Sequence, residues 1–144
     1  MGLSDGKGYP LSVIVAGANV HDCKLLERTI DEAVVGRPEP DEVEQHLCLD
    51  KGFDNPTGES AALAAGYVPH IRRIGEEKLD EKQKKTHPAR RWVVERLGRW
   101  LTGCRAILVR YAKRSRIYQG LIDLQCCLLW YRRIRMVGEL DVLR

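Results

Sequence analysis

The sequence contains no apolar run that approaches the length of a membrane span. Its longest strictly apolar stretch covers residues 126–131, far short of the roughly 18 residues that a transmembrane helix requires. The first residues show no basic stretch followed by an apolar one, so no secretory signal is expected. Together these absences predict a cytoplasmic protein with no membrane partner.

The cysteines lack the spacing of a metal site or of a disulfide framework. The chain has five cysteines, an odd number, and no two of them form a C-x-x-C pair. Cys48, Cys104 and Cys127 lie among apolar neighbours, where a thiol behaves as a small hydrophobic group. We therefore expect reduced, structural thiols.

The net charge of +4 hides an uneven distribution. Residues 1–71 carry 5 Lys/Arg against 12 Asp/Glu, a net of −7, whereas residues 72–144 carry 19 against 8, a net of +11. Such a basic half favours a polyanionic partner, because contacts with phosphates release counterions. On charge alone, a solvated basic face is the alternative interpretation.

The hydrophobic pattern predicts strands that alternate with helices. We expect strands at residues 9–16, 46–50 and 67–74, and helices at 22–36, 57–66, 88–104 and 115–133. Asp22 and Thr57 are the candidate N-caps. Residues 75–86 are almost entirely charged or polar, which predicts a mobile linker. The order of elements indicates an α/β fold, with residues 1–144 as a single domain.

Asp50 follows a short apolar segment that is expected to be a buried strand. In open α/β sheets, ligands bind outside the carboxyl ends of the strands, so this carboxylate is a candidate site residue. The alternative is an aspartate that begins a loop and bonds to its own backbone, which is common.

Glu95 lies at the centre of the polar face of the predicted helix 88–104. The opposite face is apolar and consists of Val93, Leu97, Trp100 and Cys104. Arg91 and Arg99 flank Glu95 one helical turn to either side. Spacing alone allows two interpretations: an exposed Arg–Glu–Arg ladder, or a metal-binding carboxylate with basic residues that hold phosphates.

Two segments resemble DDE-type insertion-sequence transposases of bacteria. Residues 49–54, L-D-K-G-F-D, are similar to the element around the family's second catalytic aspartate, and residues 87–96, H-P-A-R-R-W-V-V-E-R, are similar to the signature around its catalytic glutamate. Residues 5–11, 17–22, 100–101 and 108–111 continue the likeness. The resemblance covers roughly residues 3–134.

The resemblance implies a ribonuclease H-like fold and a role in DNA transposition. In this family three carboxylates hold divalent cations, Mg²⁺ or Mn²⁺, and the DNA partners are the element's terminal inverted repeats and the target. Carried over by motif, Asp50 and Glu95 are the catalytic and metal-binding residues, and Arg91, Arg96 and Arg99 are the DNA-binding residues. The reaction is metal-dependent phosphoryl transfer, in which strand nicking is followed by attack of the 3′-hydroxyl.

The family's first catalytic aspartate has no match in this sequence. It belongs to a strand upstream of the segment that Asp5–Gly8 matches, and the resemblance places neither Asp5 nor Asp22 in its role. We therefore expect a partial ribonuclease H-like fold that lacks its first strand and ends in helices. Such a carboxy-terminal part is expected to be inactive alone, so whether it is itself an enzyme stays open. An upstream-frame transposase segment would supply the missing carboxylate; a non-catalytic DNA-binding remnant that occupies element ends is the alternative.

Overall fold

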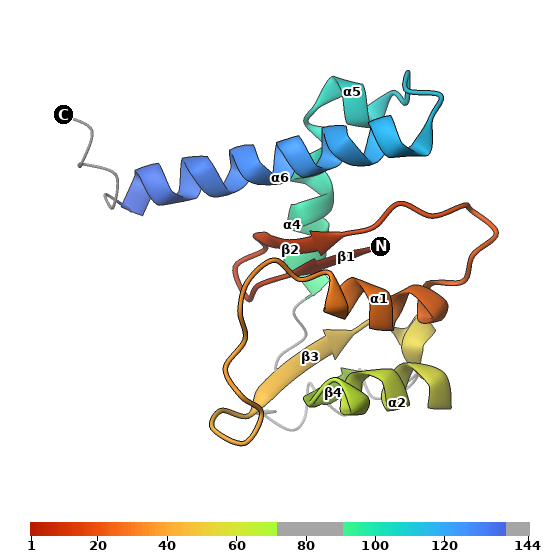
Figure 1. Cartoon of the computed structure of the whole chain (residues 1–144), viewed down its shortest axis with the longest axis vertical. Helices are drawn as coiled ribbons and strands as arrows, with labels where there is room; N and C mark the ends of the chain where they lie inside the picture. Colours follow the sequence, from red (N-terminus) through yellow and green to blue (C-terminus); the bar gives the residue numbers. More distant parts are fainter. Residues whose placement is uncertain (72–90, 138–144) are drawn as a thin grey trace, which may run out of the picture. The chain divides into compact units, whose positions relative to one another are not determined.

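The computed structural model describes residues 1–71 and 91–137, which form two compact units (Figure 1). Of the described residues, one unit comprises Met1, residues 16–71 and Arg91, and the other comprises residues 2–15 with 92–137. The predicted linker at residues 75–86 and the predicted helix start at Pro88 lie outside the described residues. None of the described helices has the length and hydrophobicity to cross a membrane.

The described residues form both helices and two small sheets, a mixed composition that is compatible with the predicted α/β class. The first unit contains η1 (Asp22–Leu25), α1 (Leu26–Asp31), β3 (Gln45–Leu49), η2 (Lys51–Phe53), α2 (Pro56–Ala64) and β4 (Tyr67–Ile71). The second unit contains β1 (Gly2–Ser4), β2 (Pro10–Val13), α4 (Arg91–Thr102), α5 (Arg105–Leu108) and α6 (Ser115–Val137). The predicted strand at 46–50 and helices at 57–66 and 115–133 are thus confirmed to within a few residues.

Strands β3 and β4 form a parallel pair, and α2 provides the crossover between them. Leu47 of β3 and Tyr67 of β4 are buried, whereas His46 and Val68, which pair on the other face, are exposed. Helix α2 ends before Gly66, whose φ of +75° is easily adopted only by glycine. Its N-cap, however, is Asn55 and not the predicted Thr57: the Asn55 side chain accepts a hydrogen bond from the Gly58 amide at 2.9 Å.

The first helical segment differs from its prediction at both ends. The N-cap of η1 is His21, which makes no side-chain capping bond, so the expected cap at Asp22 is wrong. Helix α1 ends at Asp31 and does not continue to Gly36. Helix α1 buries its apolar side, because Leu26 and Ile30 are 1% and 2% exposed.

In the second unit, residues 2–4 form the short strand β1, which the hydrophobic pattern did not predict. Strand β1 pairs antiparallel with β2, with Leu3 opposite Ser12. The turn between them is closed by Asp5, whose Oδ1 accepts hydrogen bonds from the amides of Lys7 at 2.9 Å and Tyr9 at 2.7 Å. Gly8 within this turn has φ +89°, and a side chain there would meet the Val93 carbonyl.

An aromatic cluster joins the hairpin to the helices of the same unit. The Tyr9 ring lies 5.0 Å from that of Trp100 on α4 and 5.2 Å from that of Trp130 on α6. The Trp130 indole donates a 2.7 Å hydrogen bond to the Pro10 carbonyl, so the polar end of this ring is satisfied. Helix α5, which the pattern did not predict, lies beside the first turns of α6 (Figure 1).

The five cysteines are free thiols, as expected, but not all of them are packed inside. Cys48 and Cys127 are exposed, so the prediction that these two serve as small core residues is wrong. Burial, with Asp123 and Cys127 nearby, raises the pKa of Cys126 to about 11. This thiol therefore stays protonated at neutral pH and is a poor nucleophile.

A substitution on the inner face of α4 tests the packing of the second unit. Leu97 is 3% exposed, so Leu97→Ala is expected to lower the free energy of unfolding by about 2–5 kcal/mol. The matched control is Leu108→Ala on α5, where the side chain is 63% exposed and the expected loss is about 0.5 kcal/mol or less. Urea denaturation measures both, and equal losses would contradict this packing.

Candidate functional site

Asp50 lies where the parallel strand β3 ends, as predicted. Its backbone is extended, with φ −74° and ψ 163°, and its carboxylate is exposed. Oδ1 accepts a 2.8 Å hydrogen bond from the Lys51 amide and caps the short helix η2. The strand and the cap together fix the direction in which this side chain leaves the sheet.

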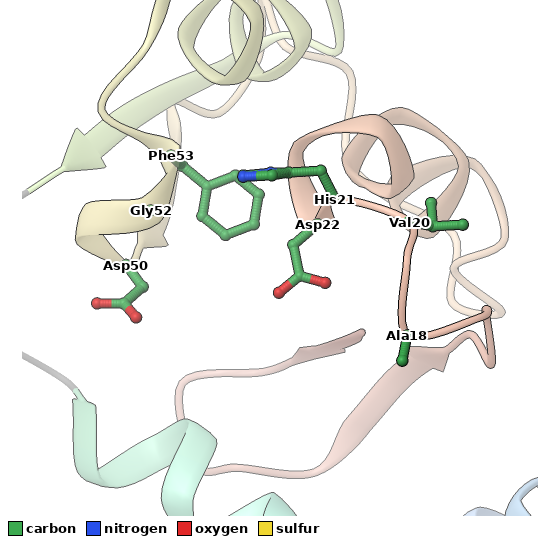
Figure 2. Close-up of a pocket in the computed structure, with 7 residues that line it drawn as sticks. All are labelled: Ala18, Val20, His21, Asp22, Asp50, Gly52 and Phe53. Atoms are coloured by element: carbon green, nitrogen blue, oxygen red, sulfur yellow. The ribbon is translucent and has the colours of Figure 1, made fainter.

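The Asp50 carboxylate opens into a pocket of about 350 Å³. The lining residues come from the segment before η1 and from the β3–η2 turn: Ala18, Val20, His21, Asp22, Asp50, Gly52 and Phe53. Figure 2 shows the carboxylates of Asp22 and Asp50 on the same side of the Phe53 ring. The structure therefore brings a second carboxylate, Asp22, to the pocket that Asp50 lines.

A small hydrogen-bond network holds the turn that follows Asp50. The Asn55 side-chain amide donates to the Gly52 carbonyl and to the Cys23 thiol, both at 3.1 Å. The Cys23 thiol in turn donates to the same Gly52 carbonyl at 3.3 Å. Sequence reasoning missed this role for Asn55, although an Asn directly before Pro56 is a usual signal for a helix start.

Glu95 lies on the exposed face of α4, as the helical spacing predicted. Val93 and Leu97, on the opposite face, are buried at 5% and 3% exposure. Arg99, one turn further on, is also exposed, whereas the Arg91 side chain lies outside the described part of the structure. The local geometry thus presents the Glu95 carboxylate to solvent on a helix that is anchored by its other face.

Arg96 is held by its own unit. Its guanidinium lies 4.6 Å from the centre of the Trp92 ring and 5.6 Å from that of Trp100. It also donates a 3.1 Å hydrogen bond to the carbonyl of Lys7 in the β1–β2 turn. This side chain therefore links α4 to the hairpin, a contact between residues 89 positions apart that sequence spacing could not reveal.

Asp5 is occupied by its own turn, since one carboxylate oxygen accepts two backbone amides. Its role is therefore structural. Within residues 1–71 and 91–137, no group of three or more His, Cys, Asp or Glu side chains stands ready to hold a metal ion. The described carboxylate pair in the Asp50 pocket thus supplies hard oxygen donors but not a complete metal shell.

Comparison with known proteins decides the family. The model of the transposase DDE domain matches residues 1–130. The chain belongs to the DDE transposase family. It is also 30% identical over 140 residues to a protein from Burkholderia cepacia that is provisionally described as a transposase for insertion sequence element IS402. This alignment covers 95% of the present chain, and the chain spans 64% of the length of that relative. No solved structure matches this chain.

The hydrogen bonds of Asn55 in the transposase domain can be tested against a neighbouring residue. Asn55→Ala removes the cap of α2 and is expected to lower the free energy of unfolding by about 1 kcal/mol. Thr57→Ala, two residues on, removes a side chain that does not cap and is expected to cost about 0.5 kcal/mol or less. Thermal or urea denaturation distinguishes them, and a larger loss for Thr57→Ala would contradict the cap assignment.

Proposed function

We propose that this chain supplies Asp50 and Glu95 as two metal-binding carboxylates of a DDE transposase and takes part in DNA transposition. The position of Asp50 carries the proposal: it leaves the carboxyl end of a parallel strand and lines a pocket that also receives Asp22. That is where ligands bind in open α/β sheets. Glu95 supports it by lying on the exposed face of a helix within the matched residues 1–130.

The fold that we propose is a partial ribonuclease H-like fold that lacks its first strand. The described strands form an antiparallel pair, β1–β2, and a parallel pair, β3–β4. An isolated two-stranded sheet is marginally stable in water, so each pair would become more stable if a further strand joined it. An upstream transposase segment outside residues 1–144 would supply both that strand and the third carboxylate.

The donor set fits a hard divalent cation, Mg²⁺ or Mn²⁺, because carboxylate oxygens are its preferred ligands. Asp22, beside Asp50, adds negative charge that a cation would neutralise. When bound, such ions stabilise the entering and leaving oxygens of an in-line displacement at phosphorus. Asp50 and Glu95 would hold them, and the extended backbone and the cap at Asp50 orient its carboxylate beforehand.

The DNA substrates are the terminal inverted repeats and the target, and the reaction proceeds in the cytoplasm. Water attacks first and nicks the element's end, and the freed 3′-hydroxyl then attacks the target strand. Arg91 and Arg99 flank Glu95 on α4 and would bind phosphates through bidentate contacts. Arg96 uses one of its five N–H donors on Lys7, so it can contact a phosphate while it keeps its structural role.

Metal binding by the full chain tests the assignment of the carboxylates. Asp50→Asn and Glu95→Gln are each expected to weaken Mn²⁺ binding by about tenfold or more, because even residues outside the ligand shell change metal affinity by about 10–100-fold. The loss of the electron paramagnetic resonance signal of free Mn²⁺ reports binding. Asp31→Asn and Glu27→Gln, on the exposed side of α1, are the matched controls and should leave it unchanged. Equal affinities for all four variants would contradict the proposal.

We further propose that residues 1–144 alone do not carry out strand transfer, because two carboxylates form an incomplete ligand set. Incubation with DNA that carries the terminal inverted repeats and Mg²⁺ should leave it intact. Cleavage that depends on Mg²⁺ and disappears in Glu95→Gln would overturn this inactivity, although it would support the role of Glu95.

A further inference from the structure

The segment that joins α5 to the first residues of α6 carries a dense group of cations. Four of the seven residues from 110 to 116 are basic and none is acidic. All four are exposed: Arg110, Lys113, Arg114 and Arg116. Tyr111 in the same segment is 70% exposed, although tyrosine rings in folded proteins are usually partly buried. This group, residues 110–116, which we call the α5–α6 basic loop, includes neither Asp50 nor Glu95.

Side-chain contacts hold the α5–α6 basic loop against α5 and α6. The Arg110 guanidinium lies 5.0 Å from the centre of the Tyr118 ring on α6 and donates to the Ala112 carbonyl at 3.3 Å. The Tyr118 hydroxyl donates to the Ile107 carbonyl on α5 at 2.9 Å. Arg110 and Tyr118 therefore shape the loop, and its remaining cations are displayed on an ordered support.

Three cations of this loop are available for a polyanion. Lys113, Arg114 and Arg116 form no ion pair with any residue in the described part of the chain. The loop also leads into the amino-terminus of the 23-residue helix α6, whose dipole adds partial positive charge. Nothing acidic within the loop offsets this charge, which favours a partner with closely spaced negative groups.

We propose that the α5–α6 basic loop is a DNA-binding surface, in which Lys113, Arg114 and Arg116 contact phosphates and Tyr111 stacks on an unpaired base. Single-stranded DNA is recognised by this combination of a positive surface with exposed aromatic rings. The choice of DNA as the polyanion rests on the proposed function in transposition. The surface itself requires no metal and none of the proposed catalytic carboxylates.

Salt dependence of DNA binding tests the phosphate contacts. The full chain is titrated onto fluorescent single-stranded and duplex oligonucleotides with EDTA present, so a failure of the metal site cannot affect the result. Each phosphate contact contributes about 0.7 to the slope of log K against log[salt] for a single strand and about 0.9 for a duplex. The double variant Lys113→Gln/Arg114→Gln is therefore expected to reduce the steepness of this slope by between about 1 and 2 and to weaken binding at low salt.

The matched control is Lys24→Gln/Arg28→Gln, which removes two exposed cations from η1 and α1 and should leave the slope unchanged. Arg114→Lys keeps the charge and should retain the slope of the unaltered chain. A slope that does not differ between the loop variant and the control variant would overturn the assignment of this surface.

A second comparison tests the stacking role of Tyr111. Tyr111→Ala is expected to weaken single-strand binding by about tenfold, within the range measured for the loss of one stacked base, and to leave duplex binding nearly unchanged. Tyr131→Ala is the control, because Tyr131 on α6 is also exposed, at 55%, but lies outside the loop. Equal single-strand affinities for the two variants would overturn the stacking role.

Discussion

The parallel pairing of β3 with β4 is the constraint on which the candidate site depends. Parallel strands need a crossover connection, and here η2 and α2 provide it directly after Asp50. The pairing buries Leu47 and Tyr67 on one face, so a shift of one residue would turn these side chains to solvent. The register therefore determines that Asp50 ends the strand, and the Asn55 network then shapes the turn beside it.

In the second unit, the packing of helix α4 determines which way Glu95 faces. Helix α4 is anchored through Val93 and Leu97, through the contact of Trp100 with Tyr9, and through the Arg96 bond to the β1–β2 turn. Because these contacts use one side and one flank of the helix, the Glu95 face remains exposed. Arg96 and Trp100, near Glu95, thus stabilise the packing of α4 on the hairpin. Exposed cations of this unit lie in the α5–α6 basic loop.

The parts of the fold that follow from periodicity could be predicted from the sequence. The strand before Asp50 and the two faces of α4 depend on local patterns of apolar residues, and both are confirmed. The errors concern choices between neighbouring polar residues: Asn55 caps α2 instead of Thr57, and no side chain caps η1 at Asp22. Strand β1 depends on pairing with β2, and Arg96 binds a carbonyl 89 residues away. Local spacing cannot predict such long-range partners. The proposed roles of the site residues stay predictions: Asp50, Glu95, Arg91, Arg96 and Arg99.

The central proposal is that Asp50 and Glu95 each bind a divalent cation. A crystal structure of the chain soaked with Mn²⁺ and measured at its absorption edge tests this directly, because anomalous scattering locates the ion without reference to the protein. We predict bound Mn²⁺ at Asp50 and at Glu95, each carboxylate with an oxygen about 2.0–2.3 Å from an ion, near the range for Mg²⁺ and its substitutes. Bound Mn²⁺ with no ion at Asp50, or with none at Glu95, would contradict the proposal.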